Sequence, residues 1–86
     1  MRRDARKDAN QAEIVAGLRK IGASVEIENA PGRPDLLVGF RRKNYLIEVK
    51  APDGALTPAQ LDFFVTWRGQ AAIVETLDDA RKVIGC

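Results

Sequence analysis

Three ionisable residues in the middle of the chain have types and spacing suited to metal-assisted hydrolysis. Asp35 begins one expected strand, and Glu48 and Lys50 lie two residues apart at the end of the next. Two neighbouring carboxylates favour a hard divalent cation such as Mg²⁺, which lowers the pKa of a bound water. A lysine beside them can orient that water or stabilise the charged transition state.

A β-hairpin formed by residues 35–40 and 45–50 would bring these residues together. We predict a register in which Asp35 lies directly opposite Lys50, so that both share a face with Glu48. The other face of this hairpin is apolar and can join the core. A purely structural role is the alternative for these three residues. Asp35 would then cap a loop, and Glu48 and Lys50 would form an ion pair at the edge of the sheet.

The composition excludes several other kinds of site. The 86 residues include no histidine, which excludes an imidazole base and a histidine metal ligand. The one cysteine, Cys86, excludes an intramolecular disulfide and a zinc finger, and it has no evident role. A hydrolase made from this chain must therefore use carboxylates, lysine, hydroxyls and an oxygen-bound metal ion.

Basic residues are concentrated in two blocks, at 1–20 and 41–50, although the formal net charge is only +2. Local positive charge of this kind attracts a polyanion such as DNA even when the net charge is small. A solvated tail and a solvated turn are the alternative. The candidates for phosphate contacts are the residues of these blocks and one loop arginine, namely Arg2, Arg3, Arg6, Lys7, Arg33, Arg41, Arg42 and Lys43.

The periodicity predicts a single α/β domain over 10–86, preceded by a flexible basic arm at 1–9. Thr57 and Gln60 have the types that an N-cap and a capping box require at the start of the second helix. No apolar run reaches the length of a membrane span, and we expect a cytoplasmic protein. The expected elements are a helix from Asn10 to Gly22, strands at 24–28, 35–40 and 45–50, a helix from Pro58 to Gly69, a strand at 71–75 and a helix at 77–84.

The second expected helix carries more aromatic surface than a small core needs. Leu61, Phe64 and Val65 fall on one apolar face, and Phe63 and Trp67 lie on a neighbouring one. We hypothesise that the Phe63–Trp67 face is a contact between subunits. Packing of all these side chains within one monomer is the alternative.

Several short motifs resemble those of a nuclease family. Pro34-Asp35 with Glu48-Val49-Lys50 is similar to the PD-(D/E)XK signature, and the order αβββαβα is similar to that superfamily's core. The wider motifs resemble the virus-type replication-repair nuclease (VRR-NUC) family over about 13–84, through Gly32-Arg33-Pro34-Asp35, Glu48-Val49-Lys50-Ala51-Pro52 and Gly54 with Leu56-Thr57-Pro58-Ala59-Gln60. The resemblance implies a restriction-endonuclease-like α/β core with a mixed central sheet flanked by helices.

The resemblance also implies roles for individual residues. Asp35 and Glu48 would bind Mg²⁺ or Mn²⁺ together with the backbone carbonyl of Val49, and Lys50 would be the catalytic lysine. Gln60 matches a glutamine that follows the loop in the family, while its competing role is the capping box.

Glu13 matches an acid that the family often carries on its first helix near the metal. It lies beside the apolar stripe of that helix by helical angle, so a solvated position is the alternative. Arg33 departs from the family pattern, as does the acidic segment before it. These differences leave open how this part of the chain contacts a DNA strand.

The stand-alone phage and bacterial members that the chain resembles are similar to Holliday-junction resolvases, which act as homodimers. Two symmetric cuts in a four-way junction need two sites related by a twofold axis. We therefore expect a metal-dependent endonuclease that cuts branched DNA as a homodimer. The alternatives are a nuclease for flaps or other DNA structures, a non-catalytic DNA-binding module, and a small protein whose basic blocks bind an acidic partner.

Overall fold

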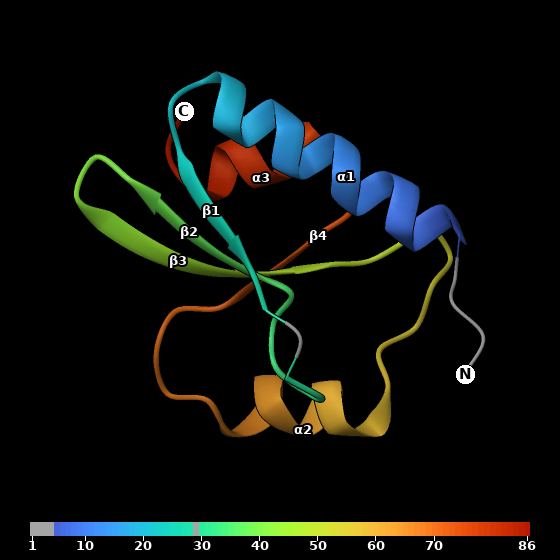
Figure 1. Cartoon of the computed structure of the whole chain (residues 1–86). Coiled ribbons are helices and arrows are strands. Elements are labelled where there is room, and N and C mark those ends of the chain that lie inside the picture. The colour runs from blue at the N-terminus through green and yellow to red at the C-terminus, as the bar shows by residue number, and fades with distance from the viewer. Residues whose placement is uncertain (1–4, 29) are drawn as a thin grey trace.

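The computed structural model describes residues 5–28 and 30–86, so Arg2 and Arg3 lie outside the described residues. A four-stranded sheet has two helices, α1 and α3, on one face, and α2 lies beyond the other face (Figure 1). The predicted order αβββαβα is confirmed. The elements are α1 (Ala5–Lys20), β1 (Ser24–Ile27), β2 (Leu36–Phe40), β3 (Lys43–Val49), α2 (Pro58–Thr66), β4 (Ala72–Val74) and α3 (Leu77–Val83).

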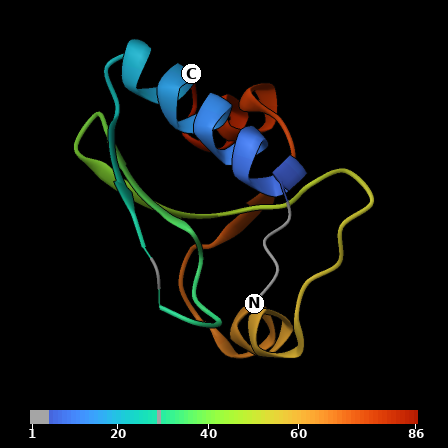
Figure 2. The ribbon, with the colours of Figure 1, turned by 45° about the vertical axis from the view of Figure 1, so that its right-hand side comes forward.

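The sheet is mixed, as predicted. Its strands lie in the order β1-β2-β3-β4, with antiparallel β1–β2 and β2–β3 pairs and a parallel β3–β4 pair. A parallel pair needs a long crossover, and α2 lies within that connection, well separated from the α1/α3 layer in both views (Figures 1 and 2). None of the helices in the described ranges is long and apolar enough to cross a membrane.

The hairpin register differs from the predicted one by two residues. Phe40 pairs with Lys43, so the turn consists of Arg41 and Arg42 alone, with φ of 52° and 66°. Positive φ at both central residues matches a tight type I′ turn. This turn could not be predicted from the residue types, because arginine rarely adopts this conformation. The prediction that Asp35 lies opposite Lys50 is therefore wrong.

A shift of two residues keeps every side chain on its predicted face, because side chains alternate with a period of two. The apolar face of the hairpin is accordingly buried under α1 and α3, as expected. Between α1 and α3, a Cβ atom built on Gly17 would clash with the methyl groups of Leu77, so glycine leaves room for the Leu77 side chain at this position. The fully buried members of this core are Ile14, Leu18, Leu36, Val38, Ile47, Val49 and Ala80.

Two helices differ from the expected ones. The first begins at Ala5 rather than at Asn10, so part of the predicted arm is helical. The second has no buried residue, and Leu61 and Val65, on its predicted apolar face, are 55% and 74% exposed. This face is not covered by the core because α2 stands away from the helical layer.

Candidate active site

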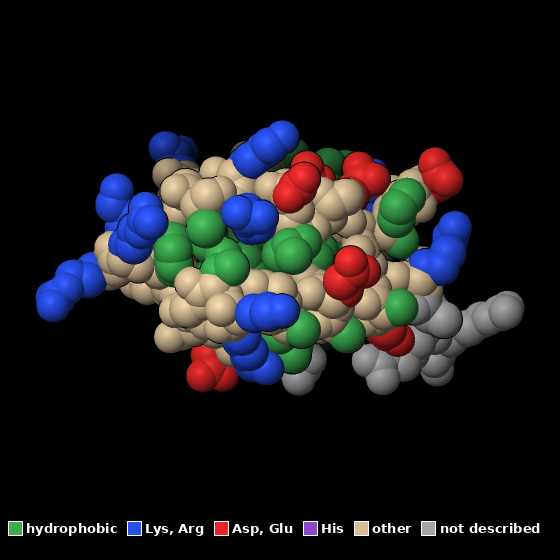
Figure 3. All heavy atoms as spheres, turned by 90° about the horizontal axis from the view of Figure 1, so that it is seen from above, with side chains coloured by type: hydrophobic (Ala, Val, Ile, Leu, Met, Phe, Trp, Pro, Cys, Tyr) green, Lys and Arg blue, Asp and Glu red, His purple; other side chains and the backbone are tan. Residues whose placement is uncertain are grey.

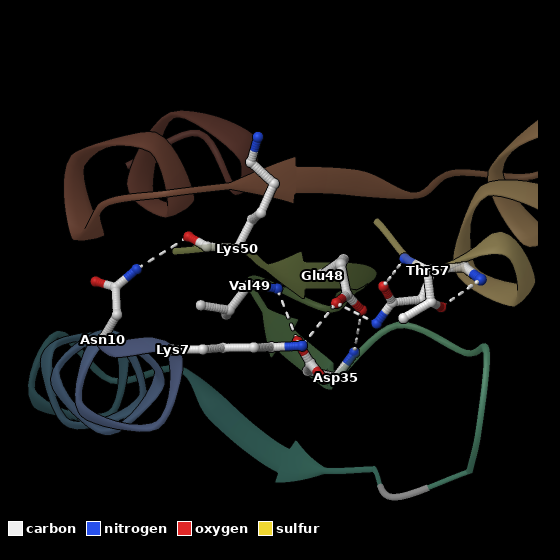
Figure 4. Close-up of polar contacts among 8 residues, drawn as sticks. Lys7, Asn10, Asp35, Glu48, Val49, Lys50 and Thr57 are labelled. Carbon is white, nitrogen blue, oxygen red and sulfur yellow. Dashed lines mark hydrogen bonds and ion pairs between the residues drawn. The ribbon is translucent and has the colours of Figure 1, made fainter. Parts of the chain in front are cut away.

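The two predicted metal-binding acids lie side by side at one end of the β2–β3 hairpin. The Asp35 backbone N–H donates to Glu48 Oε1 at 3.2 Å, and the Val49 backbone N–H donates to Asp35 Oδ2 at 2.9 Å (Figure 4). Each carboxylate is thus bonded to the backbone of the neighbouring strand. Because these strands are part of the central sheet, the positions of both carboxylates are fixed by the fold.

Lys7 of α1 supplies the positive charge nearest to the acids among the described residues. Its Nζ lies 3.1 Å from Glu48 Oε2 and 3.4 Å from Asp35 Oδ2, and Figure 4 shows the side chain extending from the helix to both. The sequence predicts Lys7 in a flexible arm that contacts phosphates, whereas in the structure Lys7 lies on α1. Its place could have been found by extending the helical pattern backward, because Lys7 lies one heptad before the buried Ile14 and is offset from it by only about 20°.

Gln60 fulfils both of the roles considered for it. Its Oε1 accepts from the Thr57 backbone N–H at 2.8 Å, and the Thr57 Oγ1 accepts from the Gln60 backbone N–H at 3.2 Å, which completes the predicted capping box. Its Nε2 donates to Glu48 Oε2 at 3.0 Å. The start of α2 is therefore joined directly to the acid pair.

Lys50 lies at the site, but its side chain points away from the acids (Figure 4). β3 ends at Val49, so strand alternation no longer governs the direction of Lys50. Both Lys50 and Lys7 line a cavity of about 100 Å³ together with Glu48 and Gln60. The lysine predicted to accompany the acids thus lines the same cavity as Glu48, whereas Lys7 makes the ion pairs with both acids.

Asn10 ties the end of β3 to α1 and to the end of β4. Its Nδ2 donates to the backbone carbonyl of Lys50 at 3.2 Å and to that of Glu75 at 2.7 Å. It is one helical turn from Lys7 on the same face of α1, and sequence analysis gave it no role beyond beginning the helix. The same backward extension of the helical pattern would have placed it facing the sheet.

Burial and charge change the ionisation of Glu48. Glu48 is only 1% exposed, and its burial, followed by the nearby charge of Asp35, raises the pKa of the Glu48 carboxyl to about 7 although Lys7 acts in the opposite direction. Burial tends to lower the pKa of the Lys7 ammonium, but the two carboxylates together raise it above its usual value. A cation that binds both carboxylates would relieve the repulsion between the negative charges of Asp35 and Glu48.

The other candidate residues are dispersed. Glu13 is exposed, and no group of three acidic or cysteine side chains suited to a metal ion occurs within 5–28 and 30–86. Arg33 is exposed in the loop just before Asp35, and Arg6 is exposed on α1. The hairpin-turn candidates Arg41, Arg42 and Lys43 are exposed at the opposite end of β2 and β3 from the acids.

The donors at the acid pair suit a hard divalent cation. Two carboxylates and backbone carbonyl oxygens are ligands for Mg²⁺ and Mn²⁺, and Mg²⁺ commonly uses one or two carboxylates while it retains several waters. Asp35, Glu48 and the carbonyl of Val49 could hold such an ion. The ion would compete with Lys7 and Gln60 for Glu48 Oε2, which both now contact.

Comparisons with known proteins give one informative result. No protein-family model matches this sequence, and no curated protein matches it. A solved structure of a VRR_NUC domain matches with a TM-score of 0.75 and 22% sequence identity, and the match covers 95% of this chain and 97% of that chain. At this identity the similarity concerns the path of the backbone. The chain has the fold of a VRR_NUC domain.

Proposed function

We propose that the chain is a divalent-metal-dependent nuclease that hydrolyses phosphodiester bonds in DNA. The observation that carries this proposal is the pair of carboxylates of Asp35, just before β2, and Glu48 of β3, each of which accepts a backbone hydrogen bond from across the hairpin in a fold shared with a VRR_NUC domain. Buried acids with raised pKa values are concentrated at functional sites because they destabilise a purely structural core. The rest of the site is built around Glu48.

Mg²⁺ or Mn²⁺ would be held by Asp35, Glu48 and the Val49 carbonyl. When bound there, the ion would lower the pKa of a water and offset charge on a phosphoryl oxygen. Gln60 keeps Glu48 in position from the side of α2. Lys50 can orient the attacking water or stabilise the transition state once its side chain turns toward the acids from the direction in Figure 4.

The basic residues suggest a path for DNA away from the acids. In Figure 3, Lys and Arg side chains gather at the left-hand end of the molecule, where Figure 1 places the β2–β3 turn. Lys43 and Glu48 are separated along β3 by about 17 Å, from the rise per residue of a strand. We propose that Arg41, Arg42 and Lys43 bind flanking duplex, and that Arg33 binds phosphates close to the acids.

We further propose that the substrate is branched DNA, with four-way junctions cut by a homodimer. Two symmetric cuts need two copies of this single site. The exposed pair Leu61 and Val65 lies one helical turn apart on α2 and is a better candidate for the subunit contact than Phe63 and Trp67, which stack on one another. Sedimentation of the wild type and of Val65→Asp tests this contact, and a monomer in both would contradict it.

A second candidate function is DNA binding without catalysis. It is favoured by Lys7, which already contacts both carboxylates where a cation would bind. Cleavage assays distinguish the two functions.

The decisive assay is cleavage of labelled linear, flap and four-way DNA in Mg²⁺, Mn²⁺ or EDTA. We expect metal-dependent cutting by the wild type, loss of cutting in Asp35→Ala and Lys50→Ala, and retention in Lys82→Ala, which removes an exposed lysine of α3. Cutting that survives in both site variants would refute the assigned site. Binding without cutting under every metal condition would favour the non-catalytic module.

A further inference from the structure

A second cavity, of about 190 Å³, lies between α2 and the sheet face that carries the acids. Its sheet side is formed by Leu37 of β2 and Leu46 of β3, which are paired across the two strands. Phe63 and Trp67 form its α2 side, and Arg33 stands at the loop that leads to Asp35. The lining is mainly apolar, with two charged residues at the loop side, Glu28 and Arg33, of which Arg33 lies two residues before Asp35.

The aromatic wall of this cavity is held in a fixed orientation. The rings of Phe63 and Trp67 are stacked, with centroids 5.0 Å apart and an interplanar angle of 18°. The Trp67 Nε1–H donates to the Gln70 carbonyl at 3.1 Å, and the Gln70 side chain bonds both backbone groups of Leu46 at 2.6 and 3.2 Å. Trp67 nevertheless remains 48% exposed. An indole fixed to the sheet and open to solvent is a suitable platform for stacking a flat ligand.

The size and surroundings of the cavity indicate what that ligand is. Cavities of about 150 Å³ accept a benzene ring, so this one has room for a nucleobase. Bases stack on exposed aromatic side chains, and an arginine can bind a phosphate or the edge of a base. Aliphatic side chains opposite the indole, here Leu37 and Leu46, would cover the second face of an inserted base.

The cavity is also placed at the right distance from the acids. Leu37 lies two residues after Asp35, and Leu46 lies two residues before Glu48, on the same face of the sheet by strand alternation. Two residues along a strand correspond to about 7 Å. A nucleotide spans such a distance between its phosphate and its base, so one nucleotide could present its phosphate to the acids and its base to the cavity.

We propose that this cavity binds one unpaired nucleobase of a DNA strand whose phosphate lies at the Asp35–Glu48 pair. The identity of the ligand rests on the proposed nuclease function. A paired base is stacked within its duplex and cannot enter the cavity without leaving the stack. Occupancy of the cavity therefore selects DNA with unpaired nucleotides, such as those at a branch point.

The chain contains a single tryptophan, Trp67, so its fluorescence reports directly on the cavity. Titrations in EDTA use three DNA probes of the same length, which are oligothymidylate, an oligonucleotide with abasic spacers throughout, and a duplex. Fluorescence anisotropy of an end label measures binding of each probe. We expect oligothymidylate to quench Trp67, and the abasic strand and the duplex to bind the basic surface without quenching it.

Variants then separate stacking from general damage to α2. Trp67→Ala should weaken oligothymidylate binding by roughly tenfold while it leaves the affinity for the abasic strand unchanged. Trp67→Phe, which keeps an aromatic ring, should restore most of the affinity. Thr66→Ala, on the neighbouring exposed position of the helix, should bind like the wild type. Circular dichroism confirms that each variant is folded.

Equal quenching by the abasic strand, absence of quenching by bound oligothymidylate, or absence of binding would overturn the proposal. A blue-shifted, concentration-dependent Trp67 emission without DNA would also overturn it, because the cavity would then be covered by a second copy of the chain. Cleavage is read separately. Quenching without cleavage would refute the nuclease function alone, whereas cleavage without quenching would refute the base-binding cavity alone.

Discussion

The raised pKa of Glu48 makes the stability of the metal-free protein depend on pH in a direction unusual for a carboxylate. The ordinary pKa of this group is 4.5, and in the folded chain it is raised to about 7. Between these values the folded state retains a proton that the unfolded state has released. The free energy of unfolding must therefore decrease as pH rises from about 4.5 to about 7, and be constant with respect to this group outside that range.

The expected size of the effect follows from the same shift. A change of one pKa unit corresponds to about 1.4 kcal/mol, so Glu48 should cost roughly 3 kcal/mol of stability at pH 8 relative to pH 4. Small domains have total stabilities of about 5–15 kcal/mol, so this loss is readily measured. The raised pKa of Lys7 acts in a separate window, because it stabilises the fold below about pH 10.5 and is lost only at higher pH.

Urea denaturation followed by Trp67 fluorescence, in EDTA and at half-unit steps from pH 4 to pH 8, measures this dependence. The informative quantity is the difference between the wild type and Glu48→Gln, which cannot ionise at this position. Glu26→Gln, an exposed acid on β1, is the matched control. We expect the wild type to lose roughly 3 kcal/mol relative to Glu48→Gln across this range. A constant difference, or one of opposite sign, would refute the burial argument.

The same titration predicts the behaviour of the proposed metal site. A cation must displace the Glu48 proton below about pH 7, so the apparent affinity for Mg²⁺ should fall by about tenfold for each pH unit below that value. Mg²⁺ should accordingly raise the urea midpoint more at pH 8 than at pH 6. An equal effect at both pH values would place the ion elsewhere.

Two further predictions concern side chains of α1. Lys7→Met should tighten Mg²⁺ binding at pH 9 by about tenfold in isothermal titration calorimetry, because the ammonium competes for the same oxygens. The control Lys20→Met should leave the affinity unchanged, and weaker binding to Lys7→Met would contradict the competition. Asn10→Ala should lower the free energy of unfolding by about 1–3 kcal/mol because two backbone carbonyls lose their donor. A loss no larger than that of the neighbouring Gln11→Ala would contradict this role.

The fold could be predicted from the sequence because its main determinants are local. The alternation within the hairpin, the capping box at Thr57 and the break at Gly22 mark where elements begin and end, whereas α2 ends at Thr66, before the predicted end at Gly69. The register could not be predicted, since it depends on Arg41 and Arg42 adopting left-handed conformations that their type disfavours. The prediction of which side chains share a face of the hairpin is still correct, because the register differs by two residues and side chains alternate with a period of two.

The candidate site was predictable only in part. Type and spacing predict Asp35 and Glu48, and the family resemblance adds Gln60. In the structure Asp35 and Gln60 each contact Glu48. The sequence assigns Lys7 to a flexible arm with a phosphate-contact role, and it gives Asn10 no role beyond beginning the helix. Their partners come from β2, β3 and the chain after β4, and such long-range hydrogen bonds and ion pairs have no signal in local sequence.

The surroundings of Glu48 bear on whether the acid pair is structural or functional. The adjacent positions on the same sheet face are Leu37 and Leu46, and an apolar pair at Asp35 and Glu48 would extend that surface without desolvating a charge. The chain instead holds two carboxylates together and surrounds them with the donors Lys7 and Gln60. This arrangement lowers stability near neutral pH, and a bound divalent cation would reverse the loss. Because a ligand that binds only the folded state stabilises it, the arrangement of the acid pair fits the divalent-cation site that we propose.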